Sequence, residues 1–170
     1  MSEQKQFILN KHLFKKGLIL AVIFALIDQA HKYYMLEILN IDEGEPLNIF
    51  PFFDLVMVWN KGVSFGMFNH GQTYEHQAML LAAFAIGIIV LLMYWLAKAN
   101  NKFQMYAIAL VIGGAAGNVV DRFLHGAVAD FFDFYIGTKH WPAFNIADSF
   151  ICVGVFLLVF ESLFVKNKAS

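Results

Sequence analysis

Two aspartates lie in apolar segments, where a carboxylate is costly unless it is used. Asp148 comes about one helical turn inside the apolar run 144–165, with no basic residue near it in the sequence. Asp130 stands in Ala127-Val-Ala-Asp-Phe-Phe132. Two carboxyl groups that share one proton can activate water against an amide carbonyl without a metal ion or a covalent intermediate. If the chain is an enzyme, this is the chemistry that its residues offer.

Other kinds of site find less support in the sequence. No serine has a lysine at a workable spacing, and His125 and His140 have no third ligand to complete a metal site. We therefore expect no metal and no cofactor. Cys152, the only cysteine, falls in an apolar run, where we expect a buried and inert thiol. The net charge of −1 argues against nucleic acid as a partner.

More polar residues gather at one end of three apolar segments. Within each segment their spacing of three or four places them on one helical face. The three sets are Asp28 with Lys32; Asn118 with Asp121 and Arg122; and Asn145 with Asp148 and Ser149. Three such faces at one level predict a polar pocket. The alternative is structural, with Asp28–Lys32 and Asp121–Arg122 as neutralised pairs that hold helices together.

The composition identifies the elements that must position these residues. Of 170 residues 59% are hydrophobic and only 15% are charged, which indicates an integral membrane protein. The predicted fold is an all-α membrane protein, a single domain over 1–170 with four transmembrane helices. The spans are expected at about 17–39, 78–97, 103–122 and 144–165. Gly113, Gly114 and Gly117 predict a close helix-packing surface.

The first span is the least regular, because Asp28 and Lys32 interrupt its apolar run. Lys11, Lys15 and Lys16 ahead of that run also resemble the start of a cleavable signal peptide. No clean cleavage site follows, and apolar character resumes at Tyr33. A membrane span is therefore the preferred interpretation.

The distribution of charge predicts the orientation. Basic residues flank the spans on one side: Lys5, Lys11, Lys15, Lys16, Lys98, Lys102, Lys166 and Lys168. The positive-inside rule makes this side cytoplasmic, so both termini are expected inside the cell and the polar pocket near the outer surface.

Two segments then lie outside. The first, about 40–76, contains a β-prone run from Leu47 to Trp59, broken by Pro51. It predicts a small extracytoplasmic β-rich subdomain between spans one and two, lying on the membrane surface. The second, 124–143, is rich in aromatic residues and is expected to be interfacial.

Five segments, in order, resemble the signature blocks of the lipoprotein signal peptidases (type II signal peptidases). They are Asp28-Gln-Ala-His-Lys32, Asn60-Lys-Gly-Val-Ser-Phe65, Gly117-Asn-Val-Val-Asp-Arg122, Val128-Ala-Asp-Phe131 and Phe144-Asn-Ile-Ala-Asp-Ser149. The resemblance covers nearly the whole chain. It implies an aspartic endopeptidase of the bacterial cytoplasmic (inner) membrane, which removes signal peptides from prolipoproteins by cutting before the diacylglyceryl-modified cysteine. The implied partners are these prolipoproteins and membrane lipid.

The resemblance also assigns residues. The catalytic pair it implies is Asp130 and Asp148. Supporting or substrate-binding residues follow from the same blocks: Asn60, Asn118, Arg122, Asn145, Asp28, Lys32, Gly62 and Asp121. Asp121 matches an aspartate beside the site and not a catalytic one, although the residues alone would make it an equal candidate.

Two other functions fit the composition. Intramembrane aspartates also serve small transporters and proton relays, and a non-catalytic lipid-binding or assembly protein could use them as helix caps. The polar residues cluster at one end of the spans and do not continue to the cytoplasmic side, which argues against a transport path.

Overall fold

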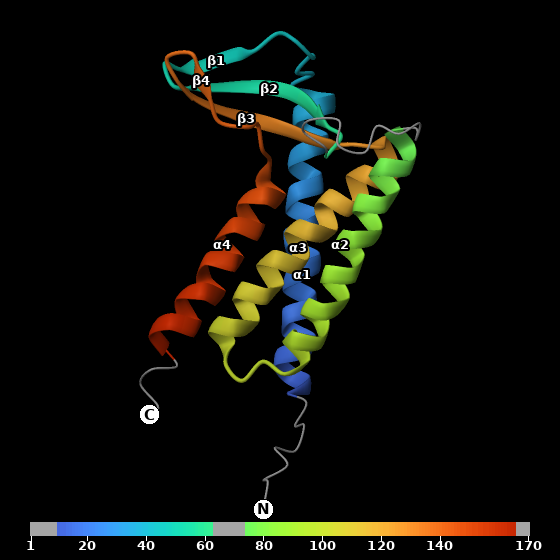
Figure 1. Ribbon diagram of the computed structural model, residues 1–170, viewed down its shortest axis with the longest axis vertical. Helices are drawn as coiled ribbons and strands as arrows, with labels where there is room; N and C mark the ends of the chain where they lie inside the picture. Colours follow the sequence, from blue (N-terminus) through green and yellow to red (C-terminus); the bar gives the residue numbers. More distant parts are fainter. Residues whose placement is uncertain (1–9, 63–73, 166–170) are drawn as a thin grey trace, which may run out of the picture.

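The structure is a computed structural model that describes residues 10–62 and 74–165. Its four long helices are α1 (Lys11–Tyr33), α2 (Tyr74–Ala97), α3 (Lys102–His125) and α4 (Ile146–Phe160). A π-helical turn extends α1 over Tyr34–Ile38, and another extends α4 over Glu161–Val165. The helices stand together below a small sheet (Figure 1). Parts of two predictions lie outside the described residues, namely Val63–Phe65 of the second signature block and the basic residues Lys5, Lys166 and Lys168.

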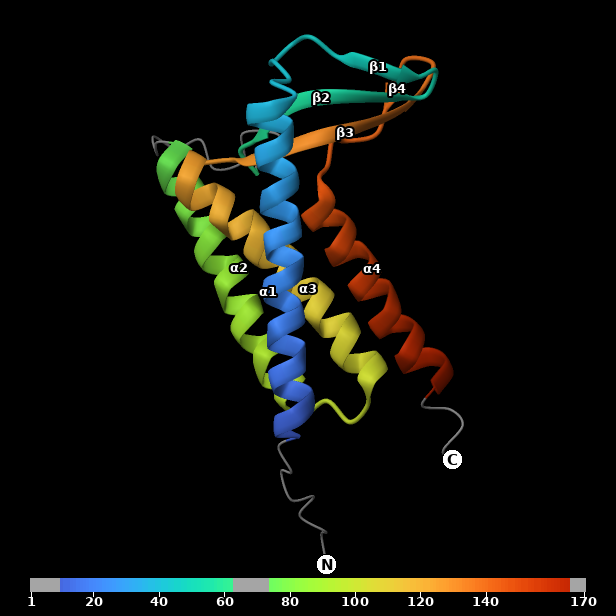
Figure 2. The ribbon, with the colours of Figure 1, turned by 180° about the vertical axis from the view of Figure 1, so that it is seen from behind.

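Helix α3 packs against α1, α2 and α4 (Figures 1 and 2). Its small residues allow this close contact, as predicted. A Cβ atom at Gly113 would lie 2.7 Å from the carbonyl oxygen of Ala21 in α1, and one at Gly114 would collide with the carbonyl oxygen of Ala147 in α4. Around them is an apolar core that includes Met105, Ile108 and Leu96.

Asparagine side chains begin three of the helices. Asn10 accepts a hydrogen bond from the backbone of Leu13 in α1, Asn101 from Gln104 in α3 and Asn145 from Asp148 in α4. Asparagine is favoured at this position because its oxygen satisfies an otherwise unpaired amide of the first turn. Helix α3 ends at Gly126, whose φ of 69° favours glycine.

Among the described residues, three helical segments are long and apolar enough to cross a membrane: His76–Ala97, Lys102–His125 and Ile146–Leu163. Helix α1 has comparable length, but Asp28, Gln29, His31 and Lys32 make its C-terminal half polar. The prediction of a mostly helical membrane protein with a small sheet is confirmed at this level.

Cys152 is exposed on α4, so the expectation of a buried thiol is wrong. The face of α4 that meets α3 carries Ala147, Ile151 and Gly154, spaced by four and three residues. Cys152 falls beside this stripe and points away from the bundle, toward the side that lipid would cover.

The sheet has four antiparallel strands in the order β1 (Leu47–Phe50), β2 (Phe53–Asn60), β3 (Val128–Ile136) and β4 (Lys139–His140). Strands β1 and β2 come from the predicted β-prone run, with Pro51 in the turn between them. The prediction that the sheet is confined to the segment between spans one and two is wrong. Strands β3 and β4 come from the segment between α3 and α4. Strand β3 pairs with β2, which joins the two segments in one sheet.

Candidate active site

The N-terminus of α4 positions two of the predicted residues. Asn145 Oδ1 accepts from the backbone N–H of Asp148 at 2.9 Å, and Asp148 Oδ2 accepts from the backbone N–H of Asn145 at 3.2 Å. This reciprocal capping box fixes both side chains relative to the helix. The other oxygen of Asp148, Oδ1, accepts from Asn118 Nδ2 of α3 at 2.8 Å.

Strand β3 brings Asp130 to the same place. Its Oδ1 accepts from Asn145 Nδ2 at 2.8 Å and its Oδ2 from Asn60 Nδ2 of β2 at 2.9 Å. Only 1% of Asp130 is exposed. Burial raises the pKa of Asp130 to about 7, and the negative charge of Asp148 adds to this effect, against the hydrogen bonds from Asn60 and Asn145.

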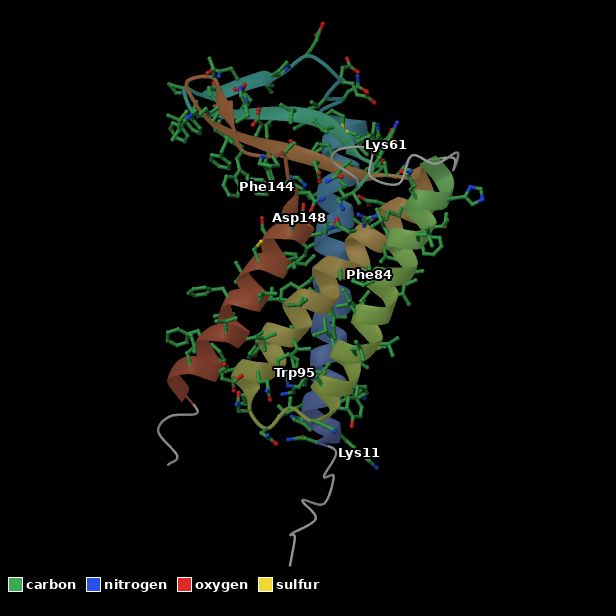
Figure 3. All side chains as sticks on the ribbon, viewed as in Figure 1. Lys11, Lys61, Phe84, Trp95, Phe144 and Asp148 are labelled. Atoms are coloured by element: carbon green, nitrogen blue, oxygen red, sulfur yellow. The ribbon has the colours of Figure 1, made fainter. Side chains whose placement is uncertain are left out.

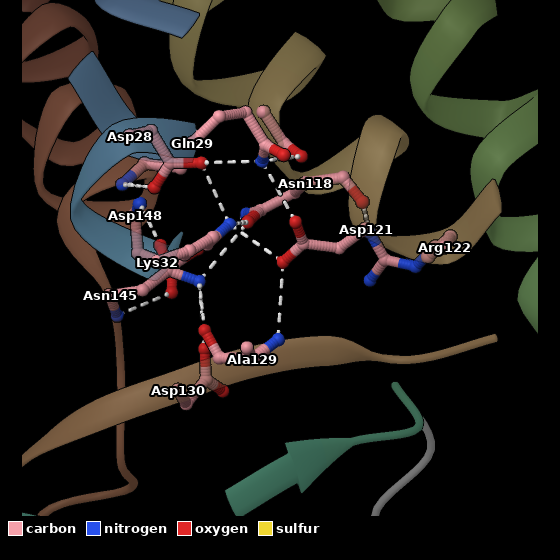
Figure 4. A network of polar contacts seen from close by, with 12 residues as sticks. Asp28, Gln29, Lys32, Asn118, Asp121, Arg122, Ala129, Asp130, Asn145 and Asp148 are labelled. Atoms are coloured by element: carbon pink, nitrogen blue, oxygen red, sulfur yellow. Dashed lines mark hydrogen bonds and ion pairs between the residues drawn. The ribbon is translucent and has the colours of Figure 1, made fainter. Parts of the chain in front are cut away.

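The two aspartates thus belong to one network, shown in Figure 4. Asn145 connects them directly, since its amide donates to Asp130 and its backbone N–H to Asp148. The polar faces of three helices meet as predicted, since Asn118 of α3 contacts both Lys32 of α1 and Asp148 of α4. Strand β3 also contributes Asp130, and Figure 3 shows Asp148 at the end of the bundle where the sheet lies.

A buried ion cluster lies next to this pair. Lys32 Nζ is 2.7 Å from Asp28 Oδ2 and 2.7 Å from Asp121 Oδ2. Both carboxylates also accept from the backbone of other elements. Asp28 accepts through its other oxygen, Oδ1, from Ala147 N at 3.0 Å, and Asp121 accepts through the same Oδ2 from Ala129 N at 3.1 Å. The cluster therefore ties α1 and α3 to the start of α4 and to β3.

The structural alternative for Asp28 and Lys32 agrees with this cluster, whereas the expected Asp121–Arg122 pair does not form. Adjacent residues of a helix point in different directions, so Asp121 meets Lys32 of α1 instead. Sequence reasoning missed Gln29, whose Nε2 donates to Asp121 Oδ1 at 2.8 Å and to the carbonyl of Gly117 at 3.2 Å. Gln29 lies inside the first signature block, and this position could have identified it as a residue of the site.

Arg122 is half-buried beside the pair. Its Nη1 donates to the backbone oxygen of Asn118 at 3.2 Å, and the negative charges of Asp148, Asp121 and Asp130 act on its guanidinium. Gly62 supports the strand side of the site. Its φ of 80° favours glycine, and its N–H donates to Asn60 Oδ1 at 2.8 Å, which turns the amide of Asn60 toward Asp130.

A cavity of about 280 Å³ adjoins Asp130 and gives access to it. Val58, Asn60, Gly62, Pro142 and Ala143 are among its lining residues. The two histidines considered as metal ligands lie on separate elements: the ring of His125 is 5.0 Å from that of Trp59, and His140 Nδ1 is 2.7 Å from Asp133 Oδ2.

The chain is similar to known proteins in both sequence and structure. The family model for signal peptidase (SPase) II matches residues 20–164. The chain is 34% identical over 162 residues to the lipoprotein signal peptidase of Pelagibacter ubique (strain HTCC1062), covering 95% of this chain and 96% of that protein. It is 37% identical over 160 residues to the lipoprotein signal peptidase of Nitrobacter hamburgensis (strain DSM 10229 / NCIMB 13809 / X14), covering 92% and 96%.

A solved structure described as a bacterial membrane enzyme superimposes with a TM-score of 0.75 and 29% sequence identity, covering 92% of each chain. The five signature blocks, the helices apolar enough for a membrane and these similarities point the same way. The chain belongs to the signal peptidase II family of lipoprotein-processing peptidases.

Proposed function

We propose that this peptidase is an aspartic endopeptidase, which removes signal peptides from diacylglyceryl-modified prolipoproteins by cutting before the lipidated cysteine. One observation carries the aspartic assignment. Asp130 of β3 and Asp148 of α4 share the hydrogen bonds of Asn145, so a carboxyl group from a strand and one from a helix meet in one network. The names of the relatives support the class of substrate.

In the proposed mechanism the pair holds one proton. Asp130, whose pKa is raised to about 7 by burial, holds it near neutral pH and donates a hydrogen bond to the scissile carbonyl oxygen. Ionised Asp148 takes a proton from water, and the resulting hydroxide attacks the carbonyl carbon. The tetrahedral intermediate collapses as the C–N bond breaks and the leaving nitrogen receives a proton from the pair.

The supporting residues have distinct tasks in this proposal. Asn60 and Asn145 hold Asp130, while Asn118 holds Asp148. Arg122 faces the pair and would hydrogen-bond a carbonyl of the substrate, which orients the scissile bond.

The proposed membrane arrangement keeps the orientation predicted from the charges. Helix α1 is also a span, the first of four, the termini are cytoplasmic, and the sheet and active site lie near the outer surface of the bacterial inner membrane. Figure 3 supports this, since Lys11 lies at the end of the bundle opposite to Asp148. A diacylglyceryl cysteine held in the outer leaflet would then be at the level of the pair.

The transporter alternative has less support. Between α1 and α3, the described residues on the far side from the sheet form an apolar cluster that includes Leu13, Ala21 and Ile112. A relay of protons or ions would need polar groups along this path.

The test uses purified full-length protein in detergent and two precursors that differ only in the diacylglyceryl group on the cysteine. Mass spectrometry should show cleavage of the lipidated precursor immediately before this cysteine, and at least about tenfold slower cleavage of the unmodified one. The rate should be the same in EDTA. Equal rates for both precursors, or a rate lost in EDTA and restored by Zn²⁺, would overturn the proposal.

The protonation of Asp130 predicts a pH dependence. As pH rises above about 7, the protonated fraction of Asp130 falls, so kcat/KM should decrease by up to about tenfold per pH unit. Stability should follow the same direction. The folded-state pKa exceeds the ordinary value of 3.8, so this contribution is fully present below about pH 4 and is lost as pH rises through 7.

The measurement is thermal unfolding in detergent from about pH 4 to about pH 8, and kcat/KM from about pH 6 to about pH 9. Asp130→Asn is the control for stability, because its unfolding midpoint should lose the part of the pH dependence that the wild type owes to Asp130. A wild-type rate that rises steadily through this range would contradict Asp130 as the proton holder.

A further inference from the structure

The ammonium group of Lys32 has three acceptors within the protein. Nζ lies 2.7 Å from Asp28 Oδ2, 2.7 Å from Asp121 Oδ2 and 3.2 Å from Asn118 Oδ1. Only 3% of Lys32 is exposed. An ammonium has three hydrogens and accepts none, so each acceptor can take one. Two of the contacts neutralise the charge, and the third reaches the residue that holds Asp148.

This third contact determines which way the amide of Asn118 points. In the structure Asn118 Oδ1 faces Lys32 and Nδ2 donates to Asp148 Oδ1 at 2.8 Å. A flipped amide would place its NH₂ against the ammonium, which cannot accept, and its oxygen against the carboxylate of Asp148. Lys32 therefore favours the one orientation in which Asn118 donates to Asp148.

Asn145 also approaches Asn118, but it is poorly placed to orient the amide of Asn118 alone. Its Nδ2 has two hydrogens for three acceptors: Asp130 Oδ1 at 2.8 Å, Asn118 Oδ1 at 3.1 Å and the carbonyl of Ala129 at 3.2 Å. The shortest of these bonds goes to Asp130. Lys32, by contrast, has three hydrogens for its three acceptors, so one of them is available for Asn118.

We propose that Lys32 is a positioning residue for peptide hydrolysis: by orienting the amide of Asn118, it fixes the hydrogen bond that Asp148 accepts. This inference rests on the proposed function, because it assumes that Asp148 is catalytic. This positioning role is separate from holding the helices together, for which the two carboxylate contacts of Lys32 are sufficient.

A triple variant separates the two roles of Lys32. Lys32→Met alone would leave Asp28 and Asp121 buried without a counter-charge, which destabilises strongly. In Lys32→Met/Asp28→Asn/Asp121→Asn the charges are gone, and the asparagine oxygens can still accept from Ala147 and Ala129. Its unfolding midpoint should be close to that of the wild type, while kcat falls at least about tenfold and KM stays within about threefold.

The matched control is Lys32→Gln in the same Asp28→Asn/Asp121→Asn background. Its amide is neutral but can donate to Asn118, so kcat should return to within about threefold of the wild type. If the methionine triple variant cleaves with the wild-type kcat, Lys32 only anchors the helices and the inference is wrong.

A double-mutant cycle decides the question if the triple variant is only partly folded. Lys32→Met and Asn118→Ala are compared singly and together in the Asp28→Asn/Asp121→Asn background, as kcat per folded molecule. If Lys32 acts through Asn118, adding Lys32→Met to Asn118→Ala lowers kcat no further. If the reductions in kcat of the two single variants multiply in the double variant, the inference is wrong. Asp148→Asn is run in parallel: full turnover by that variant means that the proposed function itself fails, whatever the cycle shows.

Discussion

Replacing Asp130 or Asp148 by asparagine is expected to lower the rate of precursor cleavage at least about a thousandfold. Water activation needs one ionised and one protonated carboxyl group, and an amide can supply neither. The fold should persist, because asparagine keeps the shape and one oxygen acceptor at each position. At Asp148 this oxygen can still accept from the backbone of Asn145. The measurement is kcat on a lipidated precursor, with thermal unfolding to confirm that each variant is folded.

Asp133 provides the matched control for these variants. It lies on β3 three residues beyond Asp130, so its side chain points to the other face of the strand, where it pairs with His140. Asp133→Asn should leave kcat within about twofold of the wild type. Turnover near the wild-type level by folded Asp130→Asn or Asp148→Asn would remove that residue from the proposed pair.

Gly114→Ala is expected to have the second largest effect, through packing. The new methyl group would collide with the carbonyl oxygen of Ala147 and lie 2.9 Å from Ile151 Cγ1, so α4 must move away from α3. Overpacking of this kind costs about 1–3 kcal/mol. The movement would also lengthen the Asn118–Asp148 hydrogen bond between the same two helices. We expect a lower unfolding midpoint and a kcat reduced at least about tenfold.

Gly87→Ala is the control for Gly114→Ala. It is also a helical glycine, in α2, but a Cβ atom there would meet nothing within 4 Å. Alanine has the higher helix propensity, so this variant should be as stable as the wild type or slightly more so. Equal behaviour of the two variants would show that the α3–α4 contact does not limit stability or catalysis.

Local sequence signals predicted the helical part of the site. The spacing of Asn145 and Asp148 predicted that the two side chains lie close together on α4, and in the structure they form the capping box at its start. The glycines of α3 predicted close packing in the same way. In each case the relevant contact depends on residues a few positions apart or on a small side chain at a helix surface.

The strand that carries Asp130 was not predicted. Its register depends on β2, where Val58 pairs with Asp130 across a long separation in sequence. The aromatic residues of this segment are equally typical of a membrane interface, so composition could not distinguish the two. Most partners of Lys32 could not be predicted for the same reason. Its contact with Asp28 is local, but its contacts with Asp121 and Asn118 depend on how α1 packs on α3.

The proposal that Asp130 and Asp148 work as one unit is tested most directly by the double variant Asp130→Asn/Asp148→Asn. Residues that act in the same step are strongly non-additive, so kcat of the double variant should be no lower than about that of the slower single variant. All three variants should remain folded and bind the lipidated precursor. A double variant slower by the product of the two single factors would show that the aspartates act independently, and a double variant that still cleaves at the wild-type rate would contradict the aspartic mechanism altogether.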